Sequence, residues 1–246
     1  MNAEPTRQLR LLDLQAIDTR LDQIVHARAH LPQLAELADL EGKARLIDDQ
    51  LVRSRTELDD VQREVAKAES DVQLVRDRAA RDQARLDAGT GTAKDLQAIQ
   101  HELTSLARRQ SELEDIELEV MERAEAAESD VGELERGRGE LTARISALET
   151  DRDKALATLD EEAARVGLPR PEVVAEVGED LVTLYEKIRA SSGGTGAAAL
   201  RQRRCGGCQL ELNSTDIQRI RNAPEDEVLR CEECRRILVR TPESGL

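Results

Sequence analysis

The sequence predicts a mainly α protein, in which a long antiparallel coiled-coil helical hairpin is followed by a small C-terminal zinc ribbon. Three observations lead to this prediction. The 246 residues include one tyrosine and neither tryptophan nor phenylalanine, whereas 35% are charged. Long stretches repeat apolar residues every three or four positions, the pattern of helices that pack on helices. All four cysteines lie near the C-terminus in two C-x2-C pairs, a spacing typical of zinc sites.

The first helix is expected to begin at the N-terminus of the chain. Thr6 follows Pro5 and is predicted to be the N-cap. Apolar residues then recur at spacings of three, four or seven, at Leu14, Ile17, Leu21, Ile24 and Leu31. Pro32 lacks a backbone donor and disfavours helical geometry at the residue before it, so we expect a kink or a break near residue 32.

A regular heptad repeat follows this proline. One seam position holds Ala44, Leu51, Leu58, Val65, Val72, Ala79 and Leu86, and the other holds Ile47, Val61, Ala68 and Val75. Ser54 and Asp82 are the exceptions at the second position. A repeat that keeps one phase for about six heptads is a strong indication of a coiled coil.

The two glycines of Ala88-Gly89-Thr90-Gly91 predict a chain reversal near residues 89–92. Thr92 and Asp95 then form a capping-box-like start for a second long helix. Its seam positions are Leu96, Leu103, Ala124, Val131, Ile145 and Leu159, with Ile99, Leu106, Leu113, Val120, Ala127, Leu134, Leu141, Leu148 and Ala155. Because the turn is short, the two helices must run antiparallel, with residue 86 near 96 and residue 44 near 138.

Polar and small residues interrupt the seam of the second helix. The polar positions are Gln110, Glu117, Arg138 and Arg152, which either fix the register of the two helices or mark where other chains enter. Gly132, Gly137 and Gly139 each cost up to about 1 kcal/mol in a helix interior. We therefore expect a locally weak segment opposite residues 44–51.

The proline cluster of Gly167-Leu168-Pro169-Arg170-Pro171 predicts a boundary between residues 1–167, the hairpin, and residues 168–246, a C-terminal domain. A short amphipathic helix is expected around residues 181–188. The remaining order is that of a zinc ribbon, in which strand and knuckle occur twice. Its expected strands cover residues 197–200, 228–230 and 237–239, and Asn213-Ser214 is expected to cap a short helix.

The cysteines are candidate metal ligands, because two C-x2-C knuckles that face each other place four thiolates at the corners of a tetrahedron. The ligands would be Cys205, Cys208, Cys231 and Cys234. A redox pair, an iron site and two disulfides are the alternatives; the absence of other cysteines and of electron-transfer motifs favours one structural Zn2+. Four thiolates leave no open coordination position, so this zinc is not expected to catalyse a reaction.

Arginines gather around the cysteines. Residues 201–240 contain nine arginines and seven acidic residues, whereas the whole chain has a net charge of −15. The candidate contacts to a nucleic acid or a protein partner are Arg201, Arg203, Arg204, Arg219, Arg221, Arg235 and Arg236. The alternative is that these side chains are merely solvated. No aromatic residue accompanies them, so a nucleic acid could be contacted only through its backbone.

These features together resemble the bacterial C4-type zinc-ribbon coiled-coil proteins. The motifs are Cys205-Gly206-Gly207-Cys208, the run Asp216–Arg221 and Cys231–Val239 beside a long N-terminal coil. The resemblance implies a non-enzymatic adaptor, since relatives of this kind bind a sigma factor, messenger RNA or secretion components. Family members usually carry glycine after the last cysteine, where this chain has Arg235. Arg235 must then adopt the backbone shape of the knuckle with a side chain attached.

Nothing in the sequence predicts catalysis. No metalloprotease helix, nucleophile elbow or phosphate-binding glycine loop occurs. His26 and His30 stand one helical turn apart and could hold a metal, although exposed polar positions explain them as well. We expect a cytoplasmic protein with no membrane span and no small-molecule substrate. Two hypotheses stay open: a ribbon that contacts nucleic acid, or a scaffold or chaperone for a transcription or secretion protein. Whether two hairpins form a homodimer also stays open.

Overall fold

The computed structural model describes residues 1–246, which form two compact units. The hairpin unit is Ala35–Glu149, and the ribbon unit combines Met1–Leu34 with Thr150–Leu246. The elements are α1(Pro5–Ala29), α2(Pro32–Asp87), α3(Ala93–Gly167), α4(Arg170–Val177), α5(Glu179–Ser191), β1(Ala197–Arg201), β2(Arg204–Cys205), α6(Ser214–Asn222), β3(Leu229–Arg230) and β4(Ile237–Val239). None of the helices is long and apolar enough to cross a membrane.

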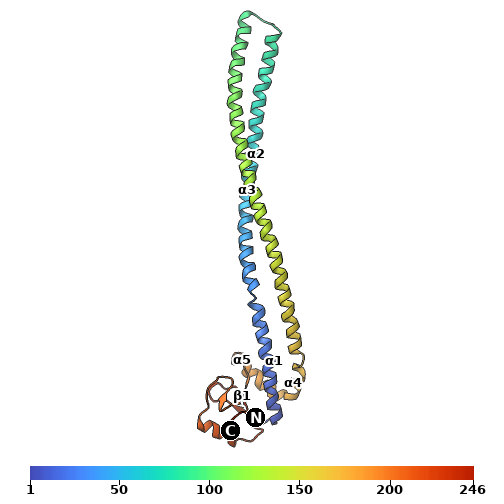
Figure 1. Cartoon of the computed structure of the whole chain (residues 1–246), viewed down its shortest axis with the longest axis vertical. Coiled ribbons are helices and arrows are strands. Elements are labelled where there is room, and N and C mark those ends of the chain that lie inside the picture. The colour runs from blue at the N-terminus through green and yellow to red at the C-terminus, as the bar shows by residue number, and fades with distance from the viewer. The chain divides into compact units, whose positions relative to one another are not determined.

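The hairpin unit confirms the predicted antiparallel coiled coil. Helices α2 and α3 run side by side (Figure 1), and every buried residue in this unit lies at a predicted seam position or continues the same repeat. These residues are Leu37, Leu40, Ala44, Leu51, Val61, Ala68 and Val72 in α2, and Leu106, Leu113, Val120 and Val131 in α3. The sequence predicts that residue 44 lies near residue 138. In the structure Arg138 donates to Asp48 at 2.7 Å, and Asp48 is one helical turn from Ala44.

The turn of the hairpin also follows the prediction. Helix α2 ends at Asp87, Gly89 adopts a φ of 61°, and α3 starts at Ala93. The backbone N–H of Thr92 donates to the Asp95 carboxylate at 2.9 Å, and the N–H of Asp95 donates to the Thr92 hydroxyl at 3.2 Å. These hydrogen bonds lower the pKa of Asp95. Together they form a reciprocal capping box, which satisfies two backbone donors at the start of α3.

The glycine-containing segment of α3 remains helical, but the surface beside it is hollowed. Gly132 and Gly139 have open space where a Cβ atom would lie. Two shallow hollows of about 520 and 360 Å³ lie between the helices here, one beside Ser54 and the other beside Arg138. Small and polar seam residues leave volume that leucines would otherwise fill. The expected local weakness of this segment stays a prediction.

The first helical boundary differs slightly from the sequence expectation. Helix α1 begins at Pro5 with Glu4 at the N-cap position, so the prediction that Thr6 caps this helix is wrong. Proline is favoured in the first turn because its missing N–H is not needed there and its φ is already helical. The predicted break near residue 32 is confirmed, since α1 ends at Ala29 and α2 starts at Pro32.

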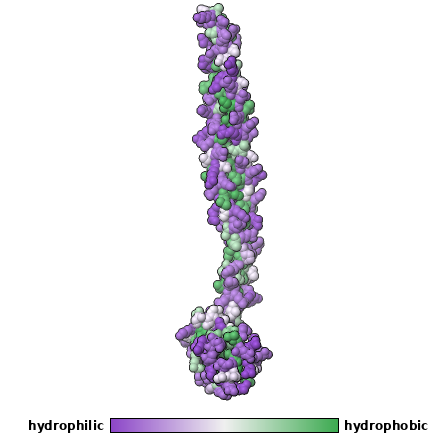
Figure 2. Space-filling view, turned by 90° about the vertical axis from the view of Figure 1, so that its left-hand side faces the viewer, coloured by the Kyte–Doolittle hydropathy of each residue, from purple (hydrophilic) through white to green (hydrophobic).

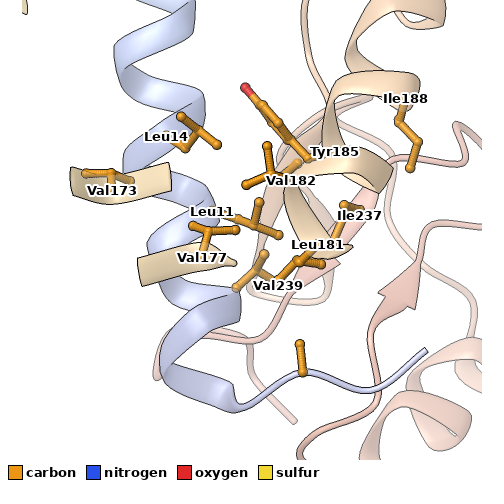
Figure 3. Close-up of a cluster of buried hydrophobic side chains, with 12 residues drawn as sticks. Leu11, Leu14, Val173, Val177, Leu181, Val182, Tyr185, Ile188, Ile237 and Val239 are labelled. Carbon is orange, nitrogen blue, oxygen red and sulfur yellow. The ribbon is translucent and has the colours of Figure 1, made fainter. Parts of the chain in front are cut away.

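The ribbon unit contains a core that joins the two ends of the chain. Figure 3 shows Leu11 and Leu14 of α1 among side chains of α4, α5 and β4. The other labelled members are Val173, Val177, Leu181, Val182, Tyr185, Ile188, Ile237 and Val239. Tyr185 is fully buried and is the only aromatic residue of the chain. Helix α1 therefore belongs to the ribbon unit. The compact units divide after Leu34 and after Glu149, and not at the predicted boundary after Gly167.

The sheet separates this core from a second one. The strand order is β2-β1-β4-β3, with β1 and β4 parallel and the outer pairs antiparallel. Successive residues of β4 alternate, because Ile237 and Val239 join the first core whereas Leu238 joins the second with Ile217 of α6. Residues 209–212, which directly follow Cys208, form no strand, and Glu211 makes only an isolated bridge with Arg204.

The N-terminal residues complete the edge of the ribbon unit. The N–H of Ala3 donates to the carbonyl of Asp226, and the N–H of Val228 donates to the carbonyl of Met1. The Gln8 side chain, which is buried, donates to the carbonyls of Ala3 and Glu225. These contacts pair the start of the chain with the segment that leads into β3.

A buried carboxylate fastens α1 to α4 and α5. The side chain of Asp18 is 4% exposed. It accepts hydrogen bonds from Arg170 at 2.7 Å and from the hydroxyl of Tyr185 at 2.9 Å, and Arg189 lies 3.7 Å away. Burial and the neighbouring Asp18 carboxylate raise the pKa of Tyr185. One turn earlier, Gln15 accepts from the backbone N–H groups of Gly196 and Ala197.

Replacement of the buried carboxylate should destabilise the ribbon unit strongly. In Asp18→Asn, Arg170 and Arg189 lose the one buried carboxylate among their partners, and we expect a loss of about 3–5 kcal/mol in the free energy of unfolding. Asp22 lies one turn further along α1, is half exposed and also pairs with Arg189. Asp22→Asn should therefore cost less than about 1 kcal/mol. Urea unfolding followed by Tyr185 fluorescence measures both, and equal costs would contradict the assignment.

Candidate metal centre

The four cysteines converge on one point of the ribbon unit. Cys205 ends β2 and Cys231 directly follows β3. Cys208 and Cys234 are the second cysteines of the two knuckles. All four sulfur atoms lie within 4.8 Å of one another. Cys205 and Cys234 are 3.8 Å apart, and Cys208 and Cys231 are 3.9 Å apart. A Zn–S bond of about 2.3 Å implies tetrahedral S–S edges of about 3.8 Å, so the arrangement fits one zinc ion.

The same distances argue against two of the alternatives, disulfides and a single redox pair. All four cysteines are free thiols, and their separations far exceed the S–S bond of about 2.05 Å of a disulfide. The close approach of the two knuckles also makes a four-ligand site and not a single redox pair. When zinc is bound, it supplies a closed structural cross-link between the knuckles. Cys205, Cys208, Cys231 and Cys234 are the residues that would hold it.

Burial and backbone dipoles act in opposite directions on the cysteines. Burial raises the pKa of Cys205 to about 12, although the N–H groups of Cys208 and Gly207 oppose this change. Burial likewise raises the pKa of Cys231, against the N–H groups of Cys234 and Glu233. Each knuckle thus aims backbone N–H groups at its first sulfur. Donors of this kind stabilise thiolates and orient them toward a cation.

The backbone of the knuckles requires left-handed residues. Gln209 has a φ of 66° and Arg235 a φ of 61°. Each follows the second cysteine of its knuckle, and its N–H donates to the first cysteine's carbonyl, at 2.8 Å and 2.9 Å respectively. The expectation that Arg235 adopts this shape despite its side chain is therefore confirmed. Gly206 has a different reason to be glycine, because a Cβ atom there would lie 3.0 Å from the carbonyl oxygen of Ala199.

Arg236, predicted as a partner contact, has a structural role in the ribbon unit. Its guanidinium donates to the carbonyls of Thr195, Gly207 and Ser192 at 2.8–3.0 Å. It thereby joins the first knuckle to the segment between α5 and β1. Arg240 is a second arginine of this kind that the sequence did not indicate; it donates to five carbonyls between Ile220 and Glu227. No spacing in the sequence distinguishes these two arginines from exposed ones.

The other candidate arginines are exposed, and most of them pair with glutamates. Arg219 and Arg235 both contact Glu232, Arg204 contacts Glu211, and Arg201 contacts Glu243. Arg203 and Arg221 form no ion pair. Arg201, Arg203 and Arg204 are brought together at the β1–β2 turn, whereas Arg219 and Arg221 lie on α6.

The two histidines of α1 contact each other and lie outside the cysteine cluster. The rings of His26 and His30 stack 3.9 Å apart, and the Nδ1 atom of His30 lies 2.8 Å from the carbonyl oxygen of His26. Neither belongs to a group of three or more metal-ligating side chains. The polar residues that matter on α1 are Gln8, Gln15 and Asp18, which share the face of Leu11 and Leu14. Their spacing of three, four or seven could have indicated a buried polar face.

The fold and the site define a zinc-ribbon protein with a coiled-coil arm. A model described as "CT398-like coiled coil hairpin domain" matches residues 14–193, and one described as "C4-type zinc ribbon domain" matches residues 204–238. The chain belongs to the family of CT398-like coiled-coil hairpin proteins with a C4-type zinc ribbon. Neither description is that of an enzyme.

Relatives cover nearly the whole chain. Protein Rv2229c of Mycobacterium tuberculosis is 37% identical over 98% of this chain and 98% of its own length. Protein ML1638 of Mycobacterium leprae is 32% identical over 94% of this chain and 95% of its own length. A solved structure from Mycobacterium smegmatis has 38% identity and a TM-score of 0.85, covering 98% of this chain and 100% of that one.

A more distant solved structure shares the fold alone. CT398 from Chlamydia trachomatis has 18% identity and a TM-score of 0.68, and the similarity covers 96% of this chain and 98% of that one. The long hairpin combined with a ribbon is therefore retained where most side chains differ.

Loss of one cysteine should remove the metal and disturb the ribbon unit selectively. We expect one zinc per chain by elemental analysis, and none in Cys208→Ser, because three thiolates cannot close the tetrahedral site. The hairpin unit contains no cysteine, so most of the helical circular dichroism should persist. A variant that retains its full zinc content, or a wild-type protein without zinc, would refute the assignment.

Replacement of Arg236 should loosen the metal centre. Arg236→Ala leaves three carbonyls without their donor, which should cost at least about 2 kcal/mol, and a chelator should remove zinc faster than from the wild type. Arg235→Ala is the matched control, because Arg235 is exposed and its side chain pairs only with Glu232. That variant should change the free energy of unfolding by less than about 1 kcal/mol. Equal zinc-release rates in both variants would exclude the structural role of Arg236.

Proposed function

We propose that this protein is a non-catalytic adaptor whose hairpin unit binds a basic, partly apolar segment of a protein partner. The observation that carries the proposal is an exposed apolar pair within an acidic stretch of α3. Leu118 and Met121 are 59% and 39% exposed, and their spacing of three places them on the same face of the helix. A two-helix coil does not need these side chains for its own seam.

The charge around this pair specifies the chemistry of the partner. Residues 112–135 contain eleven carboxylates and one arginine, Arg123. Some of these carboxylates pair across the hairpin, as Glu114 does with Arg76 and Glu135 does with Arg55, but most are exposed to solvent. Figure 2 shows hydrophobic patches along the hairpin among hydrophilic residues. A segment that combines lysines or arginines with aliphatic side chains would complement both properties of this surface.

The family resemblance offers candidates for the partner. A sigma factor or a secretion component would act as the client of a scaffold or chaperone. The acidity of the hairpin supports a protein client, because so negative a surface repels nucleic acid.

A second candidate function is contact with nucleic acid through the ribbon unit. Arg203 supports it, since this side chain is exposed at the β1–β2 turn and forms no ion pair. Four of the other candidate arginines are already paired with glutamates. The lack of aromatic side chains restricts such binding to phosphates. This candidate predicts that binding depends steeply on salt and on Arg203.

Purification of the tagged protein from the cells that produce it distinguishes the two candidates. We expect a bound protein that survives nuclease treatment and is lost in a Leu118→Ser, Met121→Ser double variant, with at least a tenfold lower recovery. The matched control is Leu46→Ser, Val52→Ser, whose aliphatic side chains on α2 are at least as exposed, at 64% and 67%, but lie outside the acidic stretch. This control should bind like the wild type.

Two outcomes would contradict the proposal. Equal recovery with both double variants would exclude the acidic stretch as the docking surface. A partner that disappears after nuclease treatment and in Arg203→Gln would instead establish the nucleic-acid function.

A further inference from the structure

We propose that the ribbon unit carries a second docking site, a groove centred on Arg201 and Arg204 that binds an extended acidic segment of a protein. The groove lies between α1 and the first knuckle and is independent of the hairpin surface proposed above. Its evidence is a cross-strand pair of like charges, a turn of unfavourable sequence and a cavity beside them.

Arg201 and Arg204 face each other in the β1–β2 hairpin. They are directly opposite in its register, and their side chains are 70% and 64% exposed. Like charges at opposed positions of an antiparallel pair destabilise it. An anion that binds between the two guanidinium groups would remove this repulsion, so the pair is better suited to a liganded state than to a free one.

The turn that joins these arginines also departs from the favoured chemistry. Gln202 and Arg203 have φ values of 47° and 65°, whereas a two-residue turn of this kind normally uses asparagine and glycine. The backbone beyond β4 holds the turn in place: the N–H of Gln202 donates to Glu243 at 2.7 Å, and that of Arg203 donates to Ser244 at 2.9 Å. A strained segment that the surrounding structure supports so firmly indicates a functional site.

A cavity of about 490 Å³ lies beside the arginine pair. It is lined by Leu12 and Ala16 of α1, by Ala197 and Ala198 of β1, and by Arg201 and Arg204 themselves. Such small aliphatic side chains leave room for an extended backbone.

The contacts within the chain indicate that carboxylates fit the arginine pair. Arg201 lies 3.5 Å from Glu243, and Arg204 lies 3.8 Å from Glu211; both glutamates are exposed. These long contacts can be exchanged for carboxylates of a partner at little cost. The cavity contains no aromatic surface on which a base could stack, and this favours an acidic polypeptide over a nucleic acid.

Titration with capped peptides tests the groove in the full-length, zinc-loaded protein. The probe is acetyl-Gly-Glu-Val-Glu-Gly-amide, and its neutral counterpart carries glutamine in place of both glutamates. We expect saturable amide shifts in nuclear magnetic resonance spectra at Ala197, Ala199 and Arg201. Binding of the neutral peptide should be at least tenfold weaker, and 0.5 M salt should weaken binding of the acidic peptide at least fivefold.

Substitutions then separate the groove from general attraction to arginines. Arg201→Gln, Arg204→Gln should abolish peptide binding while its melting temperature stays equal or rises, because the like-charge repulsion is removed. Arg221→Gln is the control, since Arg221 is an exposed arginine of α6 that forms no ion pair and does not line this cavity. It should bind the peptide like the wild type.

Three results would overturn the proposal. One is equal binding of the acidic and neutral peptides, and another is equal weakening by the control and the double variant. The third is an oligothymidylate of ten nucleotides that binds more tightly than the acidic peptide and shifts the same amides. That result would assign the arginine pair to nucleic acid and leave the hairpin proposal unaffected.

Discussion

The buried carboxylate of Asp18 is the interaction on which the ribbon unit depends. A carboxylate removed from water must be paired and hydrogen-bonded, or burial would cost several kcal/mol. Arg170, Arg189 and Tyr185 meet this requirement, and they come from the part of the chain that follows the coiled coil. The first helix can bury Asp18 only where these partners are present. The two ends of the chain are thereby fixed together, although more than 150 residues separate Asp18 from Arg170 in sequence.

In the ribbon unit, arginine side chains hold loops together, a role that large apolar residues have in many other proteins. With one aromatic residue in the chain, the two cores are small and aliphatic. Arg236 and Arg240 instead join loops by donating to several carbonyls each. The zinc ligands connect the knuckles in the same way, by cross-linking short segments that bury little apolar surface. Hydrogen bonds and metal ligands therefore stabilise the ribbon unit more than the packing of large apolar side chains does.

The two units differ in charge in a way that suits an adaptor. The hairpin unit is acidic and exposes aliphatic residues such as Leu118, whereas the β1–β2 turn presents Arg201 and Arg204 beside a cavity. Each surface has a locally unfavourable feature. On the hairpin, apolar side chains are exposed to water, and at the β1–β2 turn two like charges lie opposite each other. Natural sequences keep such conflicts mainly where binding relieves them. Surfaces of opposite charge would allow one chain to hold two chemically different partners.

The sequence by itself determined the coiled coil, its turn and the metal ligands. These features depend on residues within a few positions of each other: the heptad repeat, the Thr92–Asp95 capping box and the C-x2-C pairs. Only the tertiary structure decided that α1 belongs to the ribbon unit, that β1 pairs in parallel with β4, and that Arg236 is structural. These are contacts between distant parts of the chain, and any exposed helix or arginine could satisfy the same local rules. Which partners meet is fixed by the burial and hydrogen bonding of the whole unit, and no local pattern records that outcome.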